Sequence, residues 1–190
     1  MTQRRVLIIL ADGFEEIEAM GPADILRRAG IDVMLAGLSA REVTSARGVK
    51  ILADSELDKL NGEFEVVVFP GGSLGAKNLS KSEKVKTIIK EMHGKKKIIA
   101  AICASPAVVL APTGILNGKK ATCYPGMEDM FSSEVTFSDE AVVVDKNVIT
   151  SRGPGTACLF GIKLAEILAG KDVADSVKEA MLLGTKPSLG

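Results

Sequence analysis

The sequence of 190 residues has no excess of charge and few of the side chains that build metal sites or cysteine–histidine dyads. It contains one histidine, three cysteines, and 24 basic against 24 acidic residues, so its formal net charge is zero. This balance gives no electrostatic reason to expect nucleic acid or an anionic membrane as a partner. It also leaves little charge to keep copies of the chain apart, which favours self-association.

Long apolar runs are missing as well. No stretch approaches the roughly 18 apolar residues of a membrane span, and the apolar run 6–11 is too short for the core of a signal peptide. The three cysteines have no close pairing and are odd in number, which favours a reducing compartment. We therefore expect one cytoplasmic domain over residues 1–190, a length that fits one domain at roughly 100–200 residues.

Short β-branched runs alternate with stretches of helical spacing along the chain. This alternation predicts an α/β domain with a mostly parallel sheet that is covered on both faces. A capping box of Ser80 and Glu83 is expected to open a helix that runs to about His93. The pattern predicts strands at 6–11, 32–37, 65–69 and 97–102, hairpins within 42–52 and 141–151, and further helices at 15–29, 155–169 and 173–183.

In sheets of this kind, ligands bind beyond the carboxyl ends of the strands. The turns after Ala11, Phe69, Ile102 and Ser151 are therefore expected to lie close together. These are also the turns that carry the unusual residues.

Cys103 lies between the strand 97–102 and Ser105-Pro106, where proline is suited to the start of a helix. A strand-to-helix turn holds its side chain at the edge of the sheet, as in the nucleophile elbow of hydrolases. The start of a helix lowers the pKa of a thiol placed beside it. The alternative is a buried structural cysteine, and the local sequence favours neither interpretation. Cys123 and Cys158 are expected to pack structurally, and no metal site or cofactor is predicted.

The only histidine, His93, lies at a predicted helix end beside three lysines. It is not expected to reach Cys103, which disfavours a protease, because cysteine-dependent peptide cleavage needs a proton donor for the leaving amine. Acids near the first strand are the remaining partners: Glu15, Glu16 and Glu18. An ionised carboxylate raises the pKa of a thiol, whereas a neutral one donates a hydrogen bond to the thiolate. The alternative is that these acids only complement the helix dipole.

Two turns contribute further candidates. The backbone N–H groups of Gly71 and Gly72, with that of Ala104, can stabilise an oxyanion. The segment 151–156 can place Arg152 near an anionic group. The alternative for both is a structural turn.

Together these motifs resemble the DJ-1 family (the DJ-1/ThiJ/PfpI superfamily), and specifically its DJ-1 branch. In the protease-like branch a histidine directly follows the cysteine, whereas Ala104 follows here. The similarity extends over nearly the whole chain, in the stretches 6–18, 27–31, 66–78, 98–106 and 150–156.

The resemblance implies a flavodoxin-like, doubly wound sheet with helices on both faces, no cofactor, and usually a homodimer. It places Cys103 on the oxidisable nucleophile and Glu18 on the protonated acid that hydrogen-bonds it. It places Gly72 and Ala104 on the backbone oxyanion site.

The resemblance also identifies residues around the pocket. Arg47 and Arg152 correspond to basic residues near it, and Arg28 and Pro154 to residues near the pocket and the dimer interface. Tyr124 stands where many relatives have histidine. With a reference pKa of about 10, tyrosine is a hydrogen-bond donor but a poor base near neutral pH.

Two functions follow from the resemblance. One is a cysteine-dependent enzyme that acts on α-oxoaldehydes such as glyoxal or methylglyoxal, as a glutathione-independent glyoxalase or as a deglycase on glycated protein adducts. The other is an oxidative-stress sensor or redox-regulated chaperone in which Cys103 becomes a sulfinic acid. A cysteine protease ranks third.

Overall fold

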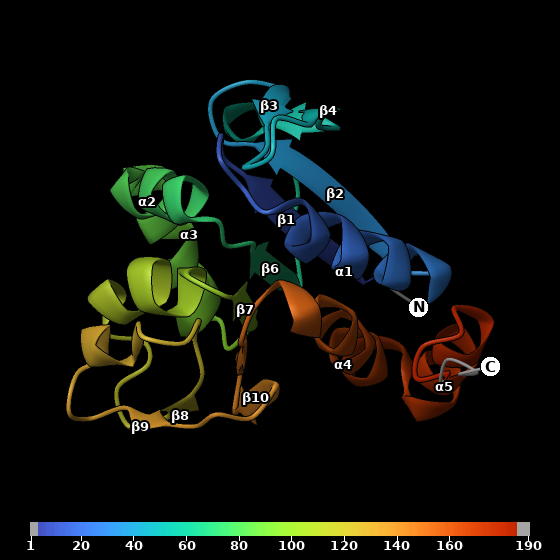
Figure 1. The fold of residues 1–190 in the computed structure, drawn as a ribbon. Coiled ribbons are helices and arrows are strands. Elements are labelled where there is room, and N and C mark those ends of the chain that lie inside the picture. The colour runs from blue at the N-terminus through green and yellow to red at the C-terminus, as the bar shows by residue number, and fades with distance from the viewer. Residues whose placement is uncertain (1–3, 186–190) are drawn as a thin grey trace.

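The computed structural model describes residues 4–185, and a seven-stranded sheet lies at its centre (Figure 1). The strands are β1 (Arg5–Leu10), β2 (Asp32–Gly37), β5 (Ser55–Glu56), β6 (Val66–Phe69), β7 (Ile98–Ile102), β10 (Val142–Asp145) and β11 (Val148–Ser151). Their order in space is β10-β11-β7-β6-β1-β2-β5. Every neighbouring pair is parallel except β10 and β11. The predicted α/β, flavodoxin-like arrangement with a mostly parallel sheet is confirmed.

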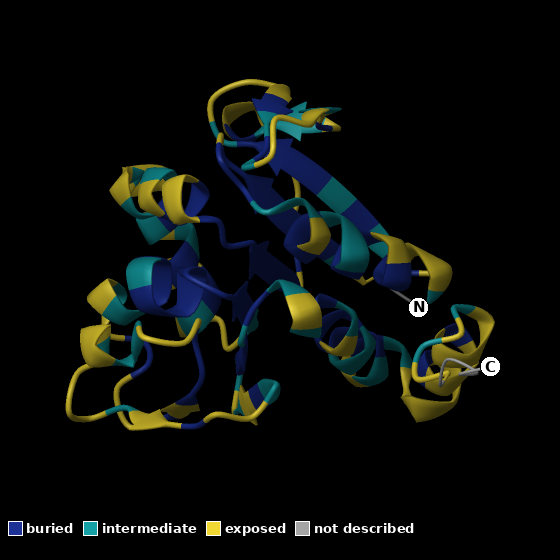
Figure 2. Ribbon diagram, in the orientation of Figure 1, coloured by how far each residue is buried: buried dark blue, intermediate teal, exposed yellow. Residues whose placement is uncertain are grey.

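Helices cover both faces of the sheet (Figure 1). One group consists of α1 (Glu16–Arg28), α4 (Ala157–Ala169) and α5 (Lys171–Ala180), in which α4 contacts both other helices. The other consists of α2 (Ser73–Lys81), α3 (Glu83–Gly94) and the π-helical turn η2 (Pro106–Leu110). Figure 2 shows the central strands buried between these layers. Of the described residues, no helix is long and apolar enough to span a bilayer.

Two small sheets flank the main one. The hairpin of β3 (Glu42–Thr44) and β4 (Lys50–Leu52) is the one predicted within 42–52, and β8 (Lys120–Ala121) pairs with β9 (Thr136–Phe137). The predicted hairpin within 141–151 is formed by β10 and β11.

The predicted start of the helix at Ser80 and Glu83 is wrong. Ser80 lies inside α2, which the sequence pattern did not predict, and its hydroxyl donates to the carbonyl of Lys77. An N-cap residue needs a non-helical backbone, and Ser82 has one, with φ −79° and ψ 117°. The Ser82 side chain accepts the N–H of Val85 at 3.3 Å and caps α3.

The four turns that were expected to meet do meet. The strands β1, β6, β7 and β11 are consecutive neighbours with parallel register, so their carboxyl ends share one edge. Across this edge the N–H of Cys103 donates to the carbonyl of Ser151 at 2.9 Å, and the N–H of Glu15 donates to that of Gly71 at 3.2 Å. The topology therefore gathers the predicted site residues of these turns.

Candidate active site

Cys103 occupies a strained turn directly after β7. Its φ is 64°, in the left-handed backbone region that residues other than glycine rarely adopt. Two backbone hydrogen bonds hold this conformation. The Cys103 N–H donates to Ser151, and the Cys103 carbonyl accepts the N–H of Tyr124 at 2.7 Å. The cysteine is 8% exposed, so it is covered by protein but reachable from the cavity that it lines.

The environment of the sulfur combines opposing influences. Burial is the largest, and together with the charge and hydrogen bonding of Glu18 it raises the pKa of Cys103 to about 12. The backbone N–H groups of Gly72 and Ala104 contact the sulfur and act in the opposite direction. The low thiol pKa expected from the helix start is therefore absent while Glu18 is ionised.

Glu18 lies in the first turn of α1 and is fully buried. Its Oε2 accepts the N–H of Gly71 at 2.8 Å. Its Oε1 has no donor in hydrogen-bonding geometry among the described residues, and the Cys103 side chain is the neighbour that affects it. Burial, the largest influence, raises the pKa of Glu18 to about 7 against the effect of Cys103 and Gly71. A substantial fraction of Glu18 is therefore protonated near neutral pH.

The two groups titrate as one pair. In the singly protonated pair, the proton can lie on the sulfur beside an ionised Glu18, which raises the thiol pKa. The same charge state includes the form with a thiolate and a protonated Glu18, which can donate a hydrogen bond to the sulfur. Moving one proton between two buried atoms thus makes the nucleophile without a change in net charge.

Gly71 lies between the side chains of Glu18 and Cys103. A Cβ at this position would lie 2.6 Å from Glu18 Oε2 and 2.7 Å from Cys103 Cβ, closer than real side chains approach. Only glycine leaves both side chains in place while its N–H donates to the carboxyl group. Gly71 therefore supports Glu18 and does not line the cavity as a pocket residue.

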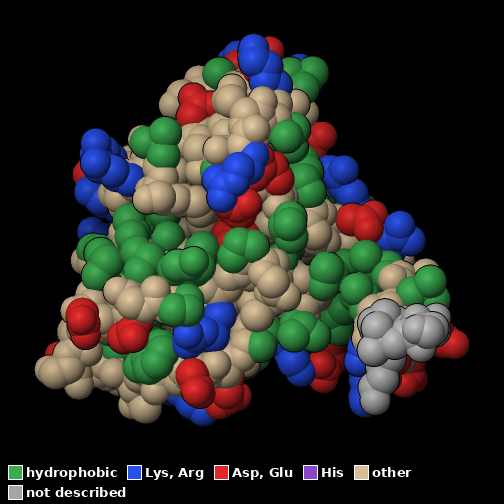
Figure 3. All heavy atoms as spheres, viewed as in Figure 1, with side chains coloured by type: hydrophobic (Ala, Val, Ile, Leu, Met, Phe, Trp, Pro, Cys, Tyr) green, Lys and Arg blue, Asp and Glu red, His purple; other side chains and the backbone are tan. Residues whose placement is uncertain are grey.

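The sulfur faces a cavity of about 900 Å³. Six other residues named in the sequence analysis line it with Cys103: Gly72, Ala104, Tyr124, Arg47, Pro154 and Glu15. Tyr124 is 47% exposed on the cavity wall. Figure 3 shows hydrophobic side chains gathered on this side of the molecule, over the region between α2 and η2.

Two predicted arginines do not line this cavity. The Arg152 guanidinium carbon lies 5.7 Å from the centre of the Phe137 ring, and its charge acts on Cys123. Arg28 lies at the last position of α1 and pairs with Asp24 at 2.8 Å on the surface. That Arg28 lies near the pocket and the interface of a dimer stays a prediction.

One wall of the cavity comes from residues that the sequence analysis did not single out. Residues 44–46 of the β3–β4 hairpin line it, along with Asp12. Asp12 Oδ1 accepts the N–H of Thr44 at 2.8 Å, and Glu16 accepts the hydroxyl of Ser45 and the N–H of Arg47. These contacts span about 30 residues of sequence, so no local pattern reveals them.

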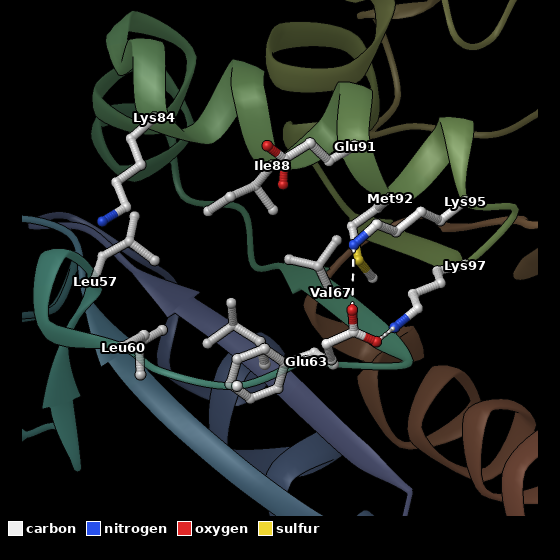
Figure 4. Close-up of a pocket in the computed structure, with 13 residues that line it drawn as sticks. Leu57, Leu60, Glu63, Val67, Lys84, Ile88, Glu91, Met92, Lys95 and Lys97 are labelled. Carbon is white, nitrogen blue, oxygen red and sulfur yellow. Dashed lines mark hydrogen bonds and ion pairs between the residues drawn. The ribbon is translucent and has the colours of Figure 1, made fainter.

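A second, smaller cavity of about 250 Å³ lies between α3 and the segment before β6 (Figure 4). Its floor is apolar, and Glu63 joins Lys95 at 3.3 Å and Lys97 at 3.1 Å (Figure 4). It contains no cysteine and none of the predicted site residues. The cavity at Cys103 is therefore the better candidate for chemistry.

The arrangement at Cys103 suits addition to a carbonyl group. A sulfur nucleophile, an adjacent acid that exchanges its proton, and two N–H groups at the sulfur are the parts that such a step needs. In the described part of the chain, no group of His, Cys, Asp and Glu side chains is placed to hold a metal ion.

Comparison with known proteins identifies the family. The model of the DJ-1/PfpI family matches residues 4–167. A Danio rerio protein, "Parkinson disease protein 7 homolog", is 46% identical over 188 residues, covering 96% of this chain and 99% of that protein. The Caenorhabditis elegans "Glutathione-independent glyoxalase DJR-1.2" is 35% identical over 184 residues, covering 95% and 97%.

Solved structures agree with the sequence comparison. The crystal structure of Drosophila melanogaster DJ-1beta is similar with a TM-score of 0.92 and 42% identity, covering 96% of this chain and 100% of that one. The structure of Toxoplasma gondii DJ-1, described as oxidized, also has a TM-score of 0.92, with 37% identity over 95% and 99%. The chain therefore belongs to the DJ-1/PfpI family.

Proposed function

We propose that the protein converts α-oxoaldehydes such as glyoxal or methylglyoxal to α-hydroxy acids, with Cys103 as nucleophile and Glu18 as proton carrier. The observation that carries the proposal is the thiol in a strained turn, in contact with a buried acid whose pKa is about 7. The name of the C. elegans relative, a glutathione-independent glyoxalase, supports the reaction type.

The first step joins sulfur to the aldehyde carbon. Glu18 takes the thiol proton as Cys103 Sγ forms the C–S bond, and the C=O π bond breaks to leave an alkoxide. The N–H groups of Gly72 and Ala104 stabilise this oxyanion, and Glu18 returns the proton to give a hemithioacetal. No metal and no second thiol take part.

The second step moves hydrogen within the substrate. The Glu18 carboxylate removes the proton on the former aldehyde carbon, and the resulting enediol is protonated on the neighbouring carbon. The first carbon loses its hydroxyl proton and becomes a thioester, while the neighbouring carbonyl oxygen gains a proton and becomes an alcohol, so the oxidation and reduction balance within one molecule. Water then adds to the thioester and the C–S bond breaks, which releases glycolate or lactate and restores the thiol.

The test compares methylglyoxal consumption by the wild type and by Cys103→Ser. We expect the rate to fall to the uncatalysed level, because serine is a much poorer nucleophile at this pH. Cys158→Ser is the matched control, since Cys158 lies on α4 outside the cavity. Equal consumption by wild type and Cys103→Ser would overturn the proposal.

The same chemistry extends to early glycation adducts on proteins, which is the deglycase form of the proposal. Cys103 would attack the adduct carbon and form the same hemithioacetal. Release of free amine from a methylglyoxal-treated peptide, lost in Cys103→Ser, tests this form. If the wild type released amine no faster than the treated peptide does in buffer without protein, the deglycase form would be excluded.

A second candidate is an oxidative-stress sensor or redox-regulated chaperone. It is favoured by the two N–H groups at the sulfur, which can hold a sulfinate oxygen, and by the relative whose structure is described as oxidized. Peroxide would supply both oxygen atoms in two successive steps. Intact mass after mild peroxide treatment tests it. The candidate fails if Cys103 stays unmodified while Cys123 or Cys158 gains oxygen.

A protease remains third, because His93 does not line the cavity.

We also propose a cytoplasmic homodimer. Support for the dimer comes from exposed apolar side chains on the contacting helices α1 and α4, where Ile17 is 54% and Leu159 is 50% exposed. Light scattering on the wild type and on Leu159→Lys tests the dimer, with a shift to monomer expected for Leu159→Lys.

Support for the cytoplasmic location comes from the cysteines of the described residues, which are all free, as suits a reducing compartment.

A further inference from the structure

The cavity at Cys103 is much larger than the smallest α-oxoaldehydes. Its volume is about 900 Å³. A water molecule takes about 30 Å³ of liquid, so the five non-hydrogen atoms of methylglyoxal fill on the order of 100–150 Å³. Most of the wall therefore has no contact with a substrate of that size.

Four apolar or aromatic side chains from three separate segments line the cavity. Leu74 comes from α2, Tyr124 and Met127 come from the turn after β8, and Pro154 precedes α4. Leu74 is 55% and Tyr124 is 47% exposed. Large apolar side chains that converge on a reactive group are typical of a ligand site.

The Tyr124 ring lies beside Gly153. A Cβ at Gly153 would lie 3.3 Å from Cδ2 and 3.6 Å from Cε2 of Tyr124, so the ring lies close beside the glycine backbone. The Tyr124 N–H bond to the Cys103 carbonyl anchors the same residue to the strained turn. The backbone of Tyr124 is therefore tied to the turn that carries the thiol, and its ring packs beside Gly153.

Charged side chains also line the cavity, but they offer little attraction for an anion. They are Asp12, Glu15 and Arg47. Arg47 Nη2 lies 3.9 Å from Glu15 Oε2, so the guanidinium already faces a carboxylate. Two carboxylates against one guanidinium leave this charged set net negative, which disfavours anionic substrates.

We propose that the site selects α-oxoaldehydes whose ketone carries a bulky, uncharged apolar group, an aryl ring above all. This inference rests on the proposed function. The aldehyde carbon meets Cys103 Sγ, and the ring lies against Leu74, Tyr124 and Met127. The bonds that form and break are those of the glyoxal reaction, so phenylglyoxal and water give mandelate.

The test measures initial rates with methylglyoxal, phenylglyoxal and 4-carboxyphenylglyoxal. The informative quantity is the ratio of kcat/KM for phenylglyoxal to that for methylglyoxal, compared between variants so that intrinsic reactivity cancels. Met127→Ala is expected to lower this ratio about tenfold, since a few methylene groups in an apolar pocket are worth that much. The carboxylated substrate is expected to react about tenfold more slowly than phenylglyoxal.

Met130→Ala is the matched control. It makes the same chemical change three residues away, at a side chain that is 50% exposed and outside the cavity, so the ratio should stay within twofold of the wild type. Leu74→Ala gives a second reading if Met127→Ala loses its fold. A ratio unchanged in both cavity variants, or equal rates for the charged and uncharged aryl substrates, would overturn the inference.

The two proposals fail in different ways. If Cys103→Ser consumes all three substrates at the wild-type rate, the proposed function fails, and the selectivity inference fails with it. If turnover depends on Cys103 but the ratio does not respond to Met127 or Leu74, only the selectivity inference fails.

Discussion

Glu18 and Cys103 meet across Gly71, whose N–H donates to the carboxyl group at 2.8 Å and whose missing Cβ leaves room for both side chains. Neither side chain could keep its position if any other residue replaced this glycine. The contact makes the protonation of one group depend on the charge of the other, and most of the predictions below follow from it.

The pH dependence of Cys103 alkylation should report the pair. With Glu18 present, the pair loses its first proton near the Glu18 pKa of about 7, and a fraction of that state is thiolate. We expect the rate with iodoacetamide to rise through this pH. In Glu18→Gln that inflection should disappear, and a single rise should occur at a pH below the thiol pKa of about 12, because the negative charge is gone.

Glu18→Asp is the control for this measurement, since it keeps an ionisable group near the sulfur and should keep two inflections. An inflection near pH 7 that persists in Glu18→Gln would show that another group controls the thiol.

Protein stability should depend on pH through Glu18. Its folded pKa of about 7 lies above the ordinary value of 4.5, so the folded state holds the proton more tightly. The stabilisation is fully present below about pH 4.5 and is lost as the pH rises through 7. The free energy of unfolding of the wild type, relative to Glu18→Gln, should therefore fall by about 3 kcal/mol between pH 4.5 and 8 in urea titrations.

The contribution of Glu16 to the free energy of unfolding should have the opposite pH dependence, and Glu16→Gln tests this. Burial acts to raise the pKa of Glu16, but hydrogen bonds from Ser45 and the Arg47 N–H outweigh it and hold that pKa below its ordinary value. This carboxylate stabilises the fold at neutral pH and less as the pH falls, so Glu16→Gln should be destabilising at pH 8. If the stability differences of Glu18→Gln and Glu16→Gln from the wild type changed in the same direction with pH, the raised pKa assigned to Glu18 would be contradicted.

Gly71→Ala should damage the site and the fold together. The new methyl group would overlap Glu18 Oε2 and Cys103 Cβ, and overpacking of a buried site costs about 1–3 kcal/mol. Gly155→Ala is the matched control, because a Cβ there meets nothing within 4 Å. Urea unfolding and Cys103 alkylation of both variants check this. A Gly71→Ala protein with wild-type alkylation would show that the pair tolerates the displacement.

The corrected helix cap gives a stability prediction. Ser82→Ala removes the side-chain acceptor of the Val85 N–H and should cost about 1 kcal/mol in the free energy of unfolding. Ser80→Ala removes only a hydroxyl that donates within α2, and it should change stability by less than half as much. If Ser80→Ala is the more destabilising change, the cap is misassigned.

Much of the fold could be predicted from local patterns because those patterns have direct physical causes. The run 6–10 consists only of β-branched residues and leucine and is buried throughout, which is the composition of a central parallel strand. The same logic located β6, β7 and β11. It failed at α2, where Ser80 fits a capping pattern but already lies in a helix. A cap depends on backbone conformation, which residue identity alone does not fix.

The candidate site divides in the same way. Cys103 could be placed at a strand-to-helix turn because Pro106 and the preceding strand are local signals. Glu15, Glu16 and Glu18 could not be ranked by local sequence, because all three lie near one helix start. Only the resemblance to the family selected Glu18, and the structure shows that this side chain is fully buried with its Oε2 on the Gly71 N–H.

The sequence by itself determined the order of the strands along the chain, the residue types at the turns, and the absence of a net charge. The tertiary structure alone decided which acid meets the thiol and how its pKa responds. It also decided that Arg152 lies over Phe137 and not on the cavity wall, and that the β3–β4 hairpin supplies part of that wall. The physical reason is that burial and contact between segments far apart in sequence set these properties, and both exist only once the chain has folded.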